Sequence, residues 1–227
     1  TTTLYAMLSA LQGRGLNMMT LEDPVEYHIP QVRQTQIREE IGLNFSIGLR
    51  ALLRQDPDVL LLGEIRDQDT AQMTLRAAMT GHKVFATIHA NHNYVALLRL
   101  IEMGVAKGFL SGSLTGIISQ RLIRNVCDCH QKVTPTKQQS MLFAQRFPNQ
   151  PIPETLAIAC GCARCAMTGY RGRRVIMEIW QANSAFESLL SQPNTQLTDW
   201  LSLVEQQVAL GHWTSMNQSA YHLLCQH

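Results

Sequence analysis

The sequence has little charge and few aromatic residues. Charged residues make up 16% and aromatic residues 6% of the 227 residues, and the formal net charge is only +2. Nucleic-acid motors use basic stripes with interleaved aromatics, so we expect no nucleic-acid partner. No apolar run reaches the length of a transmembrane helix, and the N-terminus does not resemble a signal peptide. We therefore expect any association with a membrane to be peripheral.

Hydrophobic residues and cysteines are well represented. Hydrophobic residues make up 45% of the chain, which is enough for a proper core. Five of the six cysteines fall in two tight clusters, at 127 and 129 and at 160, 162 and 165. Clusters of this kind favour a metal site over disulfides and indicate a cytoplasmic protein.

Short apolar runs alternate with amphipathic segments in the first half of the chain. Residues 59–62 are uninterruptedly apolar, which is typical of a strand buried on both faces of a parallel sheet. Strands are also predicted at 16–21 and 84–88, and extended or hairpin structure at 25–37. Helices are predicted at 1–11, 45–55, 67–79 and 93–103, with Asp67 as an N-cap. This alternation predicts an α/β fold whose mostly parallel sheet carries helices on both faces.

The second half of the chain has a different pattern. The spacing of apolar residues predicts another long helix over 109–126, diluted by Gly112 and Gly116. Residues 131–159 are polar and contain prolines, which predicts a variable loop or insertion. A strand is expected at 173–180, and helices at 184–191, 197–210 and 216–224. We expect three segments: a core over 1–126, a metal-binding subdomain over 127–172, and a C-terminal strand and helical subdomain over 173–227.

Polar residues follow three of the predicted strands. Glu22 and Asp23 end the first strand, Glu64 follows the second and His89 follows the third. The carboxyl ends of parallel strands meet in one crevice, where ligands bind in open α/β sheets. Two acids and a histidine there could hold a Mg²⁺ shell, orient a water and sense a phosphate. Alternatively, Glu64 only ends its strand and caps the helix that follows.

Three longer motifs extend these strand ends. Residues 20–27 (TLEDPVEY), 53–67 (LRQDPDVLLLGEIRD) and 80–91 (TGHKVFATIHAN) resemble the Asp box, Walker B segment and His box of the type II secretion and type IV pilus assembly ATPases. The motifs occur in the order and at the spacing of that family, and residues 120–124 (QRLIR) before a cysteine cluster also fit. The resemblance extends over roughly residues 1–180 and is closest to the zinc-carrying assembly members rather than the retraction motors.

The resemblance implies a fold, partners and residue roles. It implies a RecA-like ATPase domain that works as a homo-hexamer and moves an inner-membrane platform protein from the cytoplasmic face. Glu22 would be the general base, Glu64 would act through water on Mg²⁺, and His89 would sense the γ-phosphate of ATP. The remaining nucleotide-site residues would be Thr1 as a Mg²⁺ ligand, Asp23, His82 near the phosphates, and Arg66, which with Asp67 would hold the strand end. His82 and His92 could instead be ordinary surface or helix-end histidines, and for His92 this is the expectation.

The chain opens with a segment similar to the end of the family's P-loop. Residues 1–5 read TTTLY, and the glycines and lysine of the P-loop would lie upstream of Thr1. These groups supply most of the phosphate affinity in such sites. We therefore expect a fragment of a longer ATPase that binds and hydrolyses ATP poorly by itself.

The cysteine clusters are similar to the family's tetracysteine motif. Cys162 and Cys165 match its second half, Cys127 takes the first position, and His130 falls where the second cysteine belongs. Structural zinc sites use four Cys or His ligands at such spacings. We expect Cys127, His130, Cys162 and Cys165 to hold structural Zn²⁺, with Cys129 as an alternative to His130.

Two other functions remain open at this point. A RecA-like core with a zinc ribbon and an arginine run at 171–174 could belong to a nucleic-acid motor, although the near-neutral charge argues against it. A non-catalytic scaffold that joins the same hexamer is the second alternative, because the P-loop glycines and lysine are not in this sequence.

Overall fold

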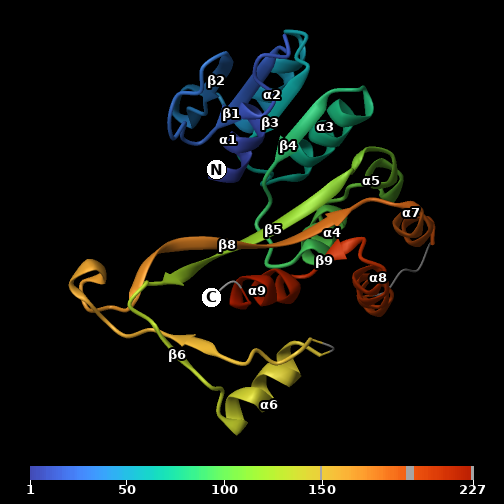
Figure 1. Cartoon of the computed structure of the whole chain (residues 1–227). Helices are drawn as coiled ribbons and strands as arrows, with labels where there is room; N and C mark the ends of the chain where they lie inside the picture. The colour runs from blue at the N-terminus through green and yellow to red at the C-terminus, as the bar shows by residue number, and fades with distance from the viewer. Residues whose placement is uncertain (149, 193–196, 226–227) are drawn as a thin grey trace. The chain divides into compact units, whose positions relative to one another are not determined.

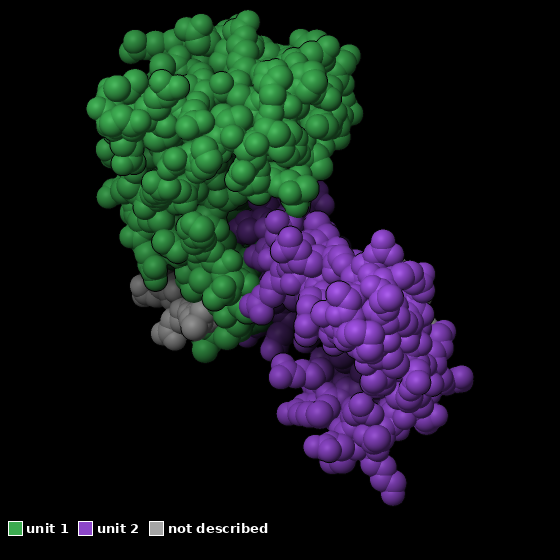
Figure 2. Space-filling model, turned by 90° about the vertical axis from the view of Figure 1, so that its left-hand side faces the viewer, with its two compact units in different colours: residues 1–115, 182–201 green, residues 116–181, 202–227 purple. Residues whose placement is uncertain are grey.

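The computed structural model describes residues 1–148, 150–192 and 197–225. The chain divides into two compact units, coloured separately in Figure 2. The first unit comprises residues 1–115 and 182–201, and the second comprises residues 116–181 and 202–227. In the described part of the chain, no helix is both long enough and apolar enough to span a membrane.

The first unit is built on a parallel sheet of four strands. The strands are β1 (Met18–Glu22), β2 (Val32–Gln36), β3 (Val59–Leu62) and β4 (Lys83–Ala86), in the order β2-β1-β3-β4. Every residue of β3 is buried, as its apolar run predicts for a central strand. The predicted α/β class is confirmed, and the carboxyl ends of β1, β3 and β4 lie next to one another (Figure 1).

Helices cover both faces of this sheet. Helix α1 (Thr2–Ser9) packs on one face, where Tyr5 and Leu8 join apolar residues of β1, β2 and β3 in a buried cluster. Helices α2 (Phe45–Leu53) and α3 (Gln68–Met79) pack on the other face, with Phe45 and Leu49 of α2 fully in the core. Successive residues of a strand point to opposite faces, so β1 presents Met18, Thr20 and Glu22 to α1.

The rest of the first unit is helical. It contains α4 (Asn93–Glu102), α5 (Lys107–Ser113), α7 (Ser184–Ser191) and the start of α8 (Leu197–Ala209). Helix α5 contacts both α3 and α7, and Lys107 Nζ donates a hydrogen bond to the Gln192 carbonyl at 2.9 Å. The helices predicted at 45–55, 67–79, 93–103, 184–191 and 197–210 are confirmed, with shifts of one or two residues at their ends.

The second unit contains an antiparallel sheet where a helix was expected. Strands β5 (Gly116–Val126), β8 (Tyr170–Gln181) and β9 (Trp213–Thr214) form this sheet, and α9 (Met216–Leu224) contacts β8. The predicted helix over 109–126 is wrong beyond Ser113, because β-branched residues such as Ile117, Ile118 and Ile123 favour a strand. Their partners in β8 lie about fifty to sixty residues further along the chain, with Ile118 opposite Ile179.

The expected variable loop also contains regular structure. Strands β6 (Gln131–Val133) and β7 (Leu156–Ile158) pair antiparallel, and α6 (Lys137–Arg146) lies between them in sequence. Thr136 and Gln139 form a capping box at the start of α6, a pattern that is visible in the sequence. A 3₁₀ turn, η2 (Ala163–Cys165), precedes β8.

The segment over 25–37 does not form a hairpin. Its ordered part, β2, pairs parallel with β1 from Met18 opposite Val32 to Glu22 opposite Gln36. A second 3₁₀ turn, η1 (Glu39–Ile41), then leads into α2. The extended structure that was one of the two expectations is thus confirmed for β2, and it places a second strand beside the end of β1 that carries Glu22.

Candidate functional site at the carboxyl ends of the parallel strands

A cavity of about 280 Å³ lies at the carboxyl ends of β1, β3 and β4. Among its lining residues are Thr1, Glu22, Asp23, Glu64 and His89. The structure thus brings together the acids and the histidine that the sequence places after three separate strands. It also brings the first residue of the chain, expected as a Mg²⁺ ligand, to the same cavity.

Glu22 is the buried acid of this cavity. Glu22 is 3% exposed and is the last residue of β1, on the face that helix α1 covers. Tyr5 donates its hydroxyl hydrogen to Glu22 Oε2, and Thr20 Oγ1 donates to Glu22 Oε1 at 2.5 Å. Gln34 Nε2, on β2, donates to the same Oε1 at 3.1 Å. Burial and the hydrogen bond to Glu22 raise the pKa of Tyr5 to about 12, so this phenol stays protonated at neutral pH.

Glu64 lies across the cavity and has two basic partners. Arg66 forms a close ion pair with Glu64 Oε1, and His89 Nε2 lies 3.0 Å from Glu64 Oε2. Arg66 Nη2 also lies 3.1 Å from Asp23 Oδ2, so one guanidinium joins the ends of β1 and β3. The hydrogen bond with Glu64 raises the pKa of Arg66 above its ordinary value. The expected role of Arg66 in holding the strand end fits these contacts.

Backbone contacts fix the segments that follow β3 and β4. The Gly63 N–H donates to the Leu21 carbonyl at 2.7 Å, and the Ile65 N–H donates to the Thr87 carbonyl at 2.8 Å. The Thr87 hydroxyl donates to the Gly63 carbonyl. A Cβ on Gly63 would lie 3.3 Å from the Leu21 carbonyl oxygen, so a side chain here would require a small shift of the backbone. These contacts place Glu64 between the ends of β1 and β4.

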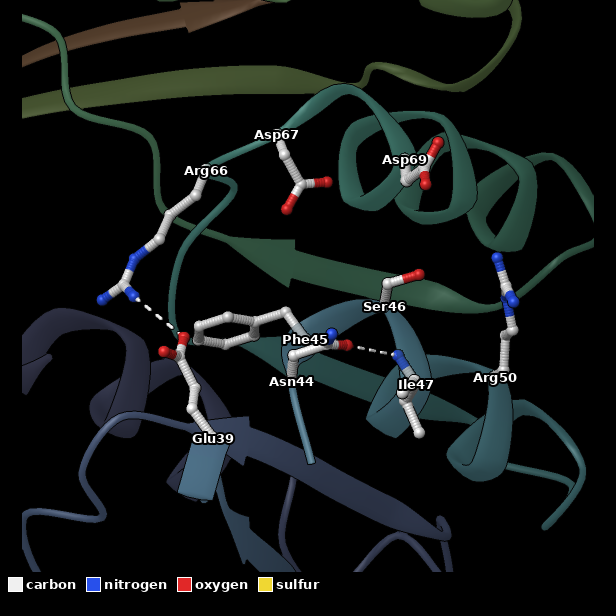
Figure 3. A pocket seen from close by; sticks show the side chains of 9 residues that line it. All are labelled: Glu39, Asn44, Phe45, Ser46, Ile47, Arg50, Arg66, Asp67 and Asp69. Atoms are coloured by element: carbon white, nitrogen blue, oxygen red, sulfur yellow. Dashed lines mark hydrogen bonds and ion pairs between the residues drawn. The ribbon is translucent and has the colours of Figure 1, made fainter. Parts of the chain in front are cut away.

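A second, larger cavity of about 420 Å³ lies at the N-terminal ends of α2 and α3 (Figure 3). Its polar groups are largely used by the helices: Asn44 Oδ1 accepts from the Ile47 N–H at 2.9 Å, and Asp67 Oδ1 accepts from the Thr70 N–H at 2.8 Å. Asp67 is therefore the N-cap of α3, as predicted. The acids and the histidine of three strand ends meet in the smaller cavity instead.

His82 does not reach this site. It precedes β4, at the opposite end of the strand from His89, and its Nδ1 lies 2.9 Å from the Ala77 carbonyl and 3.0 Å from Thr80 Oγ1. The structure therefore does not bring His82 into the carboxyl-end cavity, whose lining residues include His89. His92 is the N-cap residue of α4, as expected of a helix-end histidine.

The two cysteine clusters meet at one point of the second unit. Sulfur atoms of Cys127, Cys129, Cys162 and Cys165 all lie within 4.8 Å of one another. Three of the separations are 4.0 Å for Cys127–Cys162, 3.9 Å for Cys129–Cys165 and 3.7 Å for Cys162–Cys165. Four sulfurs around a tetrahedral zinc ion at about 2.3 Å lie about 3.8 Å apart, so the spacing fits a Cys₄ site. Disulfide sulfurs would lie at about 2.05 Å.

Cys129, rather than His130, belongs to this cluster. His130 Nδ1 lies 3.0 Å from the Cys127 carbonyl, and His130 is not in the four-residue group. The preferred Cys₃His set is therefore corrected to the alternative that contains Cys129. A backbone hydrogen bond from Cys162 lowers the pKa of Cys165 to about 6, which favours the thiolate that a metal requires.

Sequence reasoning did not assign roles to Tyr5, Thr20 or Gln34. Thr20 and Glu22 are two residues apart in a strand and so share a face, which the sequence indicates. Tyr5 shares the apolar face of α1, but its contact with Glu22 depends on how α1 packs on the sheet. The contact of Gln34 with Glu22 depends on the parallel pairing of β2 with β1, which the sequence analysis did not predict.

The fold and the site define a parallel α/β protein with acids and a histidine at the carboxyl ends of its strands. Ligands such as nucleotides usually bind at this edge of an open parallel sheet. Residues 1–220 match the family described as type II/IV secretion system protein. The chain belongs to this family. The predicted resemblance is confirmed.

Several curated relatives support the assignment. The putative type II secretion system protein E of Escherichia coli K12 is 46% identical over 179 residues, covering 78% of this chain and 36% of the relative. The type II secretion system ATPase E of Vibrio cholerae is 42% identical over 190 residues, covering 83% of this chain and 37% of the relative. The chain thus spans less than two fifths of the length of these relatives.

Solved structures share the fold. The crystal structure of the pilus retraction motor PilT with bound ADP matches with a TM-score of 0.68 and 28% identity over 99% of this chain and 53% of that chain. The Legionella pneumophila ATPase DotB matches with a TM-score of 0.64 at 19% identity, which supports the fold alone.

Proposed function

We propose that this chain is the ATP-hydrolysing part of a motor for type II protein secretion or type IV pilus assembly. One observation carries the proposal: Glu22, Glu64 and His89 line a single cavity at the ends of adjacent parallel strands. Relatives of the chain include a protein named as an ATPase and a pilus motor crystallised with ADP. Two acids and a histidine at a strand-end cavity are suited to phosphoryl transfer to water.

Each side chain has a distinct role in this proposal. Glu22 accepts the proton of the attacking water, because it is the buried carboxylate of the cavity and is already oriented by three donors. His89 contacts the terminal phosphate, since its side chain is 81% exposed and only its Nε2 pairs with Glu64. Arg66 then remains between Asp23 and Glu64 and fixes the distance between the two strand ends.

Oxygen donors suited to magnesium are present in the same cavity. Mg²⁺ prefers carboxylate, hydroxyl and water oxygens, and Thr1, Glu64 and Asp23 supply the first two kinds. When bound with ATP, Mg²⁺ would neutralise charge on the phosphates. Glu64 would hold the ion through water, and the Thr1 hydroxyl would bind it directly.

The Cys₄ cluster holds structural Zn²⁺ in this proposal. The spacing of the four sulfurs supports zinc over free thiols. Zinc would hold the segment after β5 to the segment before β8, because each segment supplies two of the four cysteines. Its role is to stabilise this part of the second unit rather than to take part in hydrolysis.

The proposed motor acts as a homo-hexamer on the cytoplasmic face of the inner membrane. Its partner is the platform protein of a secretion or pilus system, and its membrane association is peripheral. The description of the family and the names of its relatives support the part of this arrangement that concerns a secretion system.

A chimera tests the proposed function. Residues 1–227 replace the matching segment of the Vibrio cholerae ATPase E, and ATP hydrolysis is measured with the purified hexamer. We expect the chimera to hydrolyse ATP and to restore secretion to a strain that lacks its own protein. Glu64→Gln should abolish both, whereas Asp69→Asn, which changes an acid of the other cavity, should preserve both. An assembled chimera without ATP hydrolysis would refute the proposal.

A further inference from the structure

A buried polar cluster lies on the face of the sheet that α1 covers. Thr20 of β1 and Gln34 of β2 are directly opposite each other in the parallel register. Glu22 lies two residues beyond Thr20 and so points to the same face. Tyr5 of α1 closes the cluster from above, and the residues Tyr5, Thr20 and Glu22 are at most 3% exposed. The cluster is therefore part of the core, and its Glu22 end borders the cavity.

The donors of this cluster leave one acceptor position on Glu22. A carboxylate offers about four lone-pair positions, two on each oxygen. Thr20 Oγ1 and Gln34 Nε2 donate to Oε1, and Tyr5 donates to Oε2. The remaining lone pair is on Oε2, the oxygen that Tyr5 contacts. Because Glu22 lines the cavity, this lone pair is the one that can accept a hydrogen bond from water.

Two of the three donors, Gln34 and Tyr5, are themselves oriented by other groups. Gln34 Oε1 accepts from the Ile29 N–H at 2.7 Å, which fixes which end of the amide faces Glu22. The two hydrogens of Gln34 Nε2 serve Glu22 Oε1 and the Tyr27 carbonyl, each at 3.1 Å. The Tyr5 oxygen accepts from the Glu26 N–H at 3.3 Å, which leaves its own hydrogen to be donated to Glu22.

We infer that Tyr5, Thr20 and Gln34 are positioning residues that hold the Glu22 carboxylate in one orientation, with the free lone pair of Oε2 toward the cavity. The inference rests on the proposed function, in which Glu22 accepts a proton from water. Tyr5 has a further consequence, because it lies one helical turn after Thr1 on α1. A ligand that moves the start of α1 also moves the donor that sets the orientation of Glu22.

The positioning role predicts a specific kinetic pattern. Loss of a hydrogen bond to a charged group should let the carboxylate rotate and lower turnover by about 10- to 100-fold. The affinity for ATP should change little, because none of the three side chains is expected to contact the nucleotide. Thr20→Val removes the hydroxyl at nearly constant volume, and Thr20→Ser retains it.

The test has two independent readouts. In the full 227-residue chain, NMR measures hydrogen exchange of the Gln34 side-chain amide, which we expect to be slow and to become at least about tenfold faster in Tyr5→Phe. In the ATPase chimera, Tyr5→Phe and Thr20→Val should lower kcat by about 10- to 100-fold with KM for ATP within about twofold, whereas Thr20→Ser should restore kcat. Tyr27→Phe is the matched control, because this ring packs against Tyr5 but is 55% exposed.

Two results would overturn the inference and can be told apart from failure of the proposed function. Unchanged exchange of the Gln34 amide in Tyr5→Phe would show that the cluster does not hold together as described. Unchanged kcat in folded Tyr5→Phe and Thr20→Val, with Glu22→Gln inactive, would overturn the positioning role alone. Full activity of Glu22→Gln would instead refute the proposed function, since the base itself would be dispensable.

Discussion

The zinc site gives a prediction that separates Cys129 from His130. In a regular tetrahedron, the distance from the centre to each vertex is the edge divided by about 1.63. Applied to the sulfur separations of 3.7, 3.9 and 4.0 Å, this ratio gives metal–sulfur distances of about 2.3 to 2.4 Å. Zinc–thiolate bonds are about 2.3 Å long, so these three sulfur separations already suit the ion.

The perturbation is therefore Cys129→Ala, with His130→Ala as its counterpart. We expect the unchanged protein and His130→Ala to bind one zinc ion per chain, because the four sulfurs are intact in both. Cys129→Ala should lose the ion during purification or on mild chelation. Metal content is measured by mass spectrometry, and X-ray absorption should show four sulfur neighbours at about 2.3 Å.

Cys160→Ala is the control for the removal of a nearby thiol. Cys160 is exposed, and its sulfur is directed at the Ile158 carbonyl at 3.6 Å rather than at the cluster. This variant should keep its zinc. Retention of zinc by Cys129→Ala together with its loss from His130→Ala, or a shell of three sulfurs and one nitrogen, would refute the Cys₄ assignment.

Two further predictions concern the first unit. Gly48→Ala should lower the free energy of unfolding by about 1 to 3 kcal/mol, because its Cβ would lie 2.7 Å from a methyl group of Leu21, which is fully buried. Gly108→Ala meets nothing within 4 Å and should leave Tm unchanged or raise it slightly, so equal destabilisation of both variants in thermal unfolding would contradict the packing described. The pKa of Tyr5 is raised to about 12 in the folded protein, so the unfolded chain loses the phenol proton at a lower pH than the folded protein does. The free energy of unfolding should therefore fall between pH 10 and 12. This fall should be smaller in Glu22→Gln in denaturant titrations, and an identical fall would argue against the Tyr5–Glu22 contact.

The parallel core could be predicted from the sequence because its signals are local. Four apolar residues in a row at 59–62 suffice to define β3, and Asp67 marks the start of α3 by its capping side chain. The convergence of Glu22, Glu64 and His89 then follows from the parallel direction of the strands. These inferences need no knowledge of which distant segments pair.

The elements that were missed depend on distant partners. Residues 117–126 could form either a helix or a strand by local pattern, and only pairing with β8 about fifty residues later decides between them. The donors to Glu22 come from α1 and from a strand whose parallel pairing was not foreseen. The Cys129 assignment likewise depends on backbone geometry after β5, where the next residue, His130, turns toward the Cys127 carbonyl.

Turnover of the Glu22→Gln chimera tests the central claim most directly. General-base catalysis contributes about 10² to 10⁴ in rate, so kcat for ATP hydrolysis should fall by that factor. ATP affinity, measured separately by equilibrium binding, should stay the same, because the amide retains the size of the carboxylate but cannot accept the proton. A kcat within a few-fold of the parent chimera would contradict the account, since it would place the chemistry away from the acids at the strand ends.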